Sequence, residues 1–279
     1  MTEEKLQALI SLLDDPDTNI YQEVKNKIIS YGDDVIPHLE YAWETSLDHL
    51  LQQRVEEIIH FLQFNAIKAA LFDWKEHHQN NLLEGAIIVA KYQYPDLNEE
   101  AINDYIHQLT QDTWLELNDS LTALEKVKVL NRIIFEIHGF NGNVKNINSP
   151  KNSYINNVIE SKKGNPITLA IVYLTVCQRL NIPIYGVNVP AHFIMAFAEH
   201  KNDVLFYLNV FNKGSVFSKH DIDKFLAQLK KEPKKEYYIP CNNLITIQRL
   251  IQHLVYTYEN LGYLDKKEEL MELLHILEQ

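Results

Sequence analysis

The most constraining feature of this sequence is an almost wholly apolar helix near the middle of the chain, predicted at Pro166–Leu180. Asn165 is a good N-cap for this helix, because its side-chain oxygen can accept a hydrogen bond from a free backbone N–H of the first turn. Pro166 suits the first helical position, where a missing N–H costs no hydrogen bond. Since apolar residues cover nearly all sides, the sequence predicts a helix buried at the centre of the fold.

Three strands are predicted directly after this helix, at Ile184–Val189, His192–Ala198 and Val204–Phe211. A further helix is predicted at Ser218–Leu229, followed by the charged link Lys230–Glu236. Consecutive short strands joined by short loops favour antiparallel pairing. The expected fold class is therefore α+β and predominantly helical, with a small antiparallel sheet packed on the central helix.

Helical patterns also occupy both ends of the chain. The first two-fifths shows apolar residues at helical spacing between tight turns, which is typical of antiparallel helix pairs of the HEAT kind. Two amphipathic helices separated by Gly262 close the sequence. They are similar to one tetratricopeptide-like unit and are expected to pack on the core. The predicted domains are a HEAT-like region at 1–78, a core at 79–232 and a helical hairpin at 233–279.

Composition excludes several classes of function. There are 26 basic and 38 acidic residues, and the resulting net charge of −12 disfavours nucleic-acid binding. With 8 Gly and 2 Cys, neither a Gly-rich nucleotide site nor a disulfide framework is expected. Histidine spacing predicts no metal site, and no cofactor is expected. The N-terminus shows no secretory signal and no stretch suits a membrane helix, so we expect a cytoplasmic protein without membrane contact.

Six short motifs follow one another in the central part of the chain. In chain order, they are Asn152-Ser-Tyr-Ile155, Gly164-Asn-Pro-Ile-Thr168, Asn181-Ile-Pro183, Tyr185-Gly-Val187, Pro190-Ala-His-Phe193 and Asn209-Val-Phe-Asn212 with Gly214. In this order they resemble the transglutaminase-like superfamily, and specifically its SirB-like branch. The resemblance extends from about residue 80 to residue 215. It implies that region 79–232 is a transglutaminase-like core.

The resemblance also implies a site. Enzymes of that superfamily carry a Cys at the start of the central helix, a His on the next strand and an Asp or Asn on the following strand. His192 occupies the His position and Asn209 the acid position. A four-residue hairpin loop at Glu199–Asn202 would place these two residues directly opposite each other on one face of the sheet.

The nucleophile position breaks the pattern. It falls at about Pro166, with Ile167 as the alternative, and neither side chain can attack a carbonyl carbon. Thr168 has a hydroxyl but no evident activating base, so we expect it to hydrogen-bond locally near the helix start. Cys177 is predicted to be a small buried apolar residue. Cys241 stands at a predicted helix start, where it is either a structural residue or a stabilised thiolate.

Two classes of function follow from these residues. The first is a non-catalytic transglutaminase-like protein that binds a protein or peptide, in which His192 is a core residue or lines a ligand cleft. The second is an amide-directed hydrolase or acyl transferase that uses His192 and Asn209 with Thr168 or Cys241 as nucleophile. The missing Cys favours the first class, and the sequence leaves the oligomeric state open.

Overall fold

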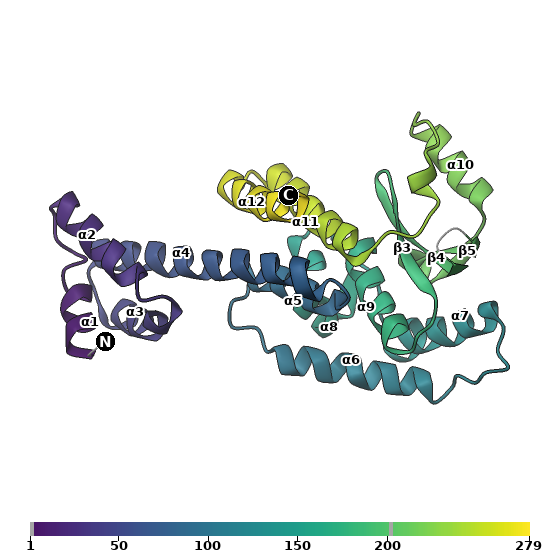
Figure 1. Ribbon diagram of the computed structural model, residues 1–279, viewed down its shortest axis with the longest axis horizontal. Coiled ribbons are helices and arrows are strands. Elements are labelled where there is room, and N and C mark those ends of the chain that lie inside the picture. Colours follow the sequence, from purple (N-terminus) through teal and green to yellow (C-terminus); the bar gives the residue numbers. More distant parts are fainter. Residues whose placement is uncertain (1–2, 201–202) are drawn as a thin grey trace. The chain divides into compact units, whose positions relative to one another are not determined.

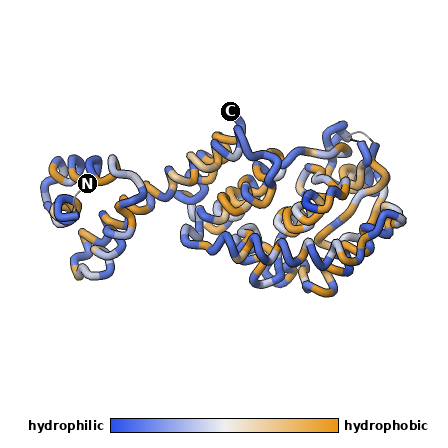
Figure 2. The backbone as a smooth tube through the Cα atoms, turned by 60° about the horizontal axis from the view of Figure 1, so that its bottom comes forward, coloured by the Kyte–Doolittle hydropathy of each residue, from blue (hydrophilic) through white to orange (hydrophobic). Residues whose placement is uncertain are grey.

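The chain forms two compact units, Met1–Ala70 and Leu71–Gln279. The computed structural model describes residues 3–200 and 203–279 (Figure 1). The helices alternate hydrophilic and hydrophobic stretches, as expected for helices with one buried face (Figure 2). Among the described residues, no helix has the length and apolar character needed to cross a membrane. The division into three domains stays a prediction.

The unit Met1–Ala70 is helical and has its own hydrophobic core. Its elements are α1 (Glu3–Ile10), α2 (Thr18–Ile29), the 3₁₀ turn η1 (Asp33–Val35), α3 (Ile36–Thr45) and most of α4 (His49–Asp73). Side chains from all four helices bury one another in this core, among them Leu6, Ile28, Leu39 and Ile58. The predicted helices are therefore present, whereas their kinship to HEAT repeats stays a prediction.

The unit Leu71–Gln279 begins with helices that lead to the central helix. They are the π turn η2 (Trp74–His78), α5 (Leu82–Lys91), α6 (Glu99–Trp114), α7 (Ala123–Asn131) and the π segment η3 (Arg132–Ile137). Thr122 and Glu125 form a capping box at the start of α7, in which each side chain bonds the other residue's backbone N–H. This reciprocal bonding fixes where the helix begins.

The central helix is buried as predicted. It is α9 (Pro166–Arg179), and every residue from Ile167 to Cys177 is buried. It follows β1 (Asn141–Gly142), η4 (Pro150–Ser153), α8 (Ile155–Ser161) and β2 (Lys163–Gly164), and the two short strands pair in parallel. Asn165 caps α9 by accepting a hydrogen bond from the backbone N–H of Thr168 at 2.9 Å. The predicted cap and the proline at the first helical position are both confirmed.

The sheet is antiparallel with strand order β3-β4-β5-β6. Its strands are β3 (Ile184–Val189), β4 (His192–His200), β5 (Asp203–Asn209) and β6 (Ser215–Phe217). The first strand agrees with the prediction, and the last one was not predicted. The third strand ends earlier than expected because the 3₁₀ turn η5 (Val210–Asn212) begins after Asn209. The predominantly helical α+β fold class is confirmed.

Helices cover both faces of this sheet. Buried side chains of β3, β4 and β5 pack with α10 (Lys219–Gln228) on one face. The other face is covered by α9, and α11 (Asn243–Leu261) packs on α5, α9 and β3. After η6 (Lys235–Tyr237) and α11, Gly262 with φ +81° ends the helix and α12 (Leu264–Glu278) completes the hairpin. The hairpin packs on the core, as expected.

Candidate functional site

His192 stands at the first position of β4, directly after the turn at Pro190 and Ala191. Its ring lies 5.9 Å from the ring of Phe225 on α10, measured between centroids. It lines a cavity of about 310 Å³ whose wall consists of Val189, His192, Ile194, Asn209, Phe217, Asp221, Ile222 and Phe225. Since side chains alternate along a strand, Phe193 points to the opposite face, on which α9 packs. The imidazole therefore faces α10.

Asn209 lines the same cavity from the end of β5, so the predicted sharing of one face is confirmed. The predicted direct pairing is wrong. Met195 lies opposite Leu208, and this register places Ile194 opposite Asn209, two residues away from His192. The reason is that β4 continues through Glu199 and His200, so the four-residue loop assumed from the sequence does not exist.

The amide of Asn209 has a local structural task. Its side-chain oxygen accepts a hydrogen bond from the backbone N–H of Phe211 at 3.0 Å, which caps η5. The chain then turns at Gly214, whose φ is +69° and where a Cβ atom would collide with the side chain of Asn131. The amide oxygen that would orient an imidazole in a triad is thus used to shape the turn between β5 and β6.

The start of α9 offers no free nucleophile. Pro166 is the first helical residue there. The Thr168 hydroxyl is fully buried and donates to the Asn165 side-chain oxygen at 3.0 Å. This confirms the expected local hydrogen bond. A hydroxyl that is both buried and hydrogen-bonded to a capping residue cannot reach a substrate without local unfolding.

Neither cysteine is placed as a nucleophile. Cys177 is fully buried, and burial raises the pKa of its thiol well above the ordinary value. Cys241 lies beside the edge strand β3, where its backbone N–H donates to the carbonyl of Gly186 at 2.8 Å. Its thiol lines a different cavity from His192, and burial raises its pKa to about 11. At neutral pH such a thiol is protonated, which removes its nucleophilic form.

A second polar cluster, unforeseen from the sequence, joins α11 to the start of α9. The Oγ atom of Ser153 lies 3.3 Å from Nδ1 of His253 and accepts a hydrogen bond from the Asn165 amide at 2.8 Å. Ser153 itself is 1% exposed. These residues lie up to a hundred positions apart, so no local motif could have shown that they meet. The spacing of Arg249 and His253 on one face of α11 was the available signal.

Arg249 influences both histidines. The pKa of His192 and of His253 is lower than the ordinary value. Burial is the main cause, and the positive charge of Arg249 is the second cause. Both imidazoles are therefore neutral at pH 7. Within the described part of the chain, the Nε atom of Arg249 is buried without a hydrogen-bond partner. No group of His, Cys, Asp or Glu among the described residues is arranged to hold a metal ion.

Comparison with known proteins assigns the family. The family model described as "Transglutaminase-like superfamily" matches residues 100–252, which is more than half of the chain. A UPF0162 protein of Xylella fastidiosa is 32% identical over 133 residues, covering 48% of this chain and 47% of that protein. A UPF0162 protein of Vibrio cholerae is 25% identical over 146 residues, covering 52% of this chain and 53% of that protein.

The chain thus spans about half the length of these bacterial relatives. F-box only protein 21 of Mus musculus is 21% identical over 251 residues, which is 80% of this chain and 37% of that protein. No solved structure matches the chain. The matched residues include α9, the four-stranded sheet and the His192 cavity. The chain belongs to the transglutaminase-like superfamily.

Proposed function

We propose that this protein is a non-catalytic member of the superfamily that binds a protein or peptide segment. The SirB-like branch is part of this proposal, because the resemblance to it rests on the order of the six motifs, among them Gly164-Asn-Pro-Ile-Thr168 at the start of the central helix. In this proposal, His192 and Asn209 are retained as parts of a binding cavity, and the position of the nucleophile is vacant.

The observation that carries the proposal is the composition of the His192 cavity. Its lining contains no Cys, Ser or Thr among the described residues. General-base catalysis requires a nucleophile within hydrogen-bond reach of the base. The candidates from the sequence lie elsewhere: the Thr168 hydroxyl is bonded to Asn165, and Cys241 lines another cavity. A neutral imidazole without a partner hydroxyl or thiol has no side-chain nucleophile to activate, so no covalent intermediate of the cysteine-enzyme kind can form there.

The same cavity suits an apolar side chain of a partner. Its wall is formed mainly by aliphatic and aromatic side chains, among them Ile194, Ile222 and Phe225. The carboxylate of Asp221 already accepts the hydroxyl of Ser218 at 2.7 Å in a capping box. Burying apolar surface in such a cavity contributes about 25 cal/mol per Å² to binding. The partner is therefore expected to insert an apolar residue beside the His192 ring.

Affinity capture from a native lysate, followed by binding measurements with the purified partner, tests this function. One variant is His192→Ala, which changes the cavity. The control is His220→Ala, which removes an exposed imidazole from α10, the helix that forms one wall of the cavity. The proposal predicts that the captured partner binds His192→Ala at least about tenfold more weakly and His220→Ala with unchanged affinity. Equal binding by wild type and His192→Ala contradicts a role for the cavity.

A further inference from the structure

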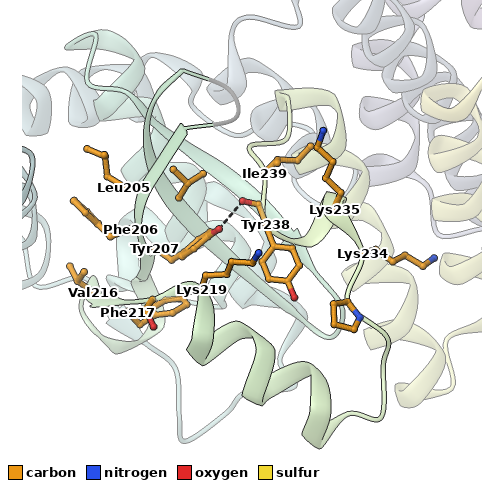
Figure 3. A pocket seen from close by; sticks show the side chains of 13 residues that line it. Leu205, Phe206, Tyr207, Val216, Phe217, Lys219, Lys234, Lys235, Tyr238 and Ile239 are labelled. Atoms are coloured by element: carbon orange, nitrogen blue, oxygen red, sulfur yellow. Dashed lines mark hydrogen bonds between the residues drawn. The ribbon is translucent and has the colours of Figure 1, made fainter.

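A larger groove lies beside the His192 cavity on the α10 side of the sheet (Figure 3). It has a volume of about 730 Å³. One wall is made by β5, β6 and the start of α10, and the other by residues 233–239. Phe217 lines both this groove and the His192 cavity, so the two share one wall residue. We call it the lysine groove, after Lys219, Lys234 and Lys235 in its lining.

The charge of the lysine groove is opposite to that of the chain. Its described lining holds Lys219, Lys234 and Lys235 but no Asp or Glu, on a chain whose net charge is −12. The Nζ atom of Lys219 lies 4.8 Å from the centroid of the Tyr238 ring, across the groove from β6. Lys234 and Glu236 are both exposed, and the Nζ atom of Lys234 lies 4.0 Å from the Oε1 atom of Glu236. The three cations are thus available to a negatively charged ligand.

The lysine groove also presents apolar surface on a rigid support. Val204 and Phe217, on the neighbouring strands β5 and β6, are partly buried apolar residues that line the groove and pack on the α10 face of the sheet. The Tyr207 hydroxyl donates to the carbonyl of Tyr238 at 2.9 Å, which ties β5 to the opposite wall. The Tyr238 hydroxyl donates to Asp223 on α10. These bonds join β5 and α10 to the segment 233–239, so the two walls are linked to each other before any ligand arrives.

We propose that the lysine groove binds an acidic peptide segment that carries one large apolar residue. The acidic side chains would contact Lys219, Lys234 and Lys235, and the apolar residue would cover Val204 and Phe217. This inference rests on the proposed binding function and names the chemistry of the partner. The charge complementarity between a basic groove and an acidic segment, on a chain that repels other anions, is the argument for this occupant.

The two kinds of contact have different consequences. An ion pair with an exposed lysine is worth little by itself, so no single lysine is expected to determine the affinity. Three cations in one groove act together on the encounter rate, and salt screens this effect over roughly 8 Å at physiological ionic strength. Burial of the apolar residue is independent of salt. The affinity is therefore expected to fall with salt but not to vanish.

A titration with a defined peptide tests the inference. The probe is a blocked ten-residue peptide of Glu and Asp around a central Leu, and the binding is measured by fluorescence anisotropy and by NMR shifts of the full chain. One comparison peptide replaces Leu by Ala, and another replaces the acidic residues by Lys. We expect binding of the first peptide, weaker binding of the Ala peptide and none of the Lys peptide, with NMR shifts centred on Val204, Phe217 and Tyr238.

Charge reversal at the groove has a matched control. The groove variant is Lys219→Glu/Lys234→Glu/Lys235→Glu. The control variant is Lys128→Glu/Lys145→Glu/Lys151→Glu, whose three lysines are exposed and outside the groove. Both variants change the net charge by the same amount. The first variant should weaken peptide binding at least about tenfold, and the second less than about threefold. Val204→Ala removes apolar surface from the groove and should weaken binding without affecting the lysines.

Three results would overturn the inference: no binding of the acidic peptide at millimolar concentration, equal losses in the two charge-reversal variants, or NMR shifts away from the groove. None of them affects the proposed function, which is judged at His192 with the captured partner. Conversely, if the peptide bound to the lysine groove and the protein also showed His192-dependent catalysis, the inference about the groove would stand and the non-catalytic function would be refuted.

Discussion

The His192 ring and the Asn209 amide line one cavity, but the Asn209 oxygen accepts its hydrogen bond from the backbone of Phe211. In a working triad, the third residue holds the base in position. Here the two residues lie out of direct register, since Ile194 is the residue opposite Asn209. The two residues therefore have a structural role at the end of the sheet. Substituting either one should first change the free energy of unfolding.

Asn209→Ala is expected to lower the free energy of unfolding by about 1 kcal/mol, because it removes the capping acceptor of η5. Urea denaturation of the purified variant measures this change. Asn212→Ala is the control, since the Asn212 amide makes its hydrogen bond to Ser215 at an exposed site. If Asn209→Ala lowered the free energy of unfolding no more than Asn212→Ala does, the cap would contribute nothing to stability.

The start of α9 permits a graded comparison. Asn165→Ala removes a buried side chain that accepts from the N–H and the hydroxyl of Thr168 and donates to Ser153, so about 2 kcal/mol of stability should be lost. Thr168→Val removes only the hydroxyl and should cost about 1 kcal/mol. Denaturant melts of both variants test the order. If Thr168→Val were the more damaging change, the hydroxyl would have a role beyond supporting the cap.

Stability should depend on the two neutral histidines. The pKa of His192 and of His253 is lowered in the folded protein from the ordinary value of 6.5, mainly by burial. The unfolded chain therefore binds more protons than the folded chain below that pH. The stabilisation is complete above about pH 6.5 and is lost as the pH falls towards the lower pKa of the folded state. Urea melts across this range in wild type, His192→Gln and His253→Gln measure the effect.

Each Gln variant should lose less stability on acidification than wild type. His220→Gln, at an exposed position of α10, should behave as wild type. Arg249→Met removes the positive charge that disfavours both imidazolium forms, so NMR titration should show a higher pKa for His192 and for His253. An unchanged pKa of both histidines in Arg249→Met would refute the electrostatic coupling across α11.

The sequence predicted local features well and long-range ones poorly. Asn165, Thr122 and Gly262 mark helix ends through interactions within a few residues, and the structure confirms all three. The register of β4 with β5 depends on where the hairpin turns, and the pattern at Glu199–Asn202 did not determine this. The short strand β6 carries too few residues to show a period.

The candidate site shows the same limit. His192 and Asn209 were found because they stand within short motifs, and their common cavity follows from strand alternation. His253 meets Ser153, near the start of α9, only because α11 packs against α9 and η4. The link Lys230–Glu236 is exposed, as its charged sequence predicts, but the sequence did not show that residues 233–239 form a wall of the lysine groove opposite β5 and β6. Contacts between distant segments need the three-dimensional arrangement.

The central claim is that no Cys, Ser or Thr among the described residues lines the His192 cavity as a nucleophile. Intact-mass spectrometry after incubation with an electrophilic amide mimic tests it most directly, using wild type, His192→Ala and Cys241→Ala. We predict no covalent adduct that depends on His192, and only slow, His192-independent labelling of Cys241, whose pKa of about 11 leaves little thiolate. A stoichiometric adduct in wild type that disappears in His192→Ala would contradict the claim.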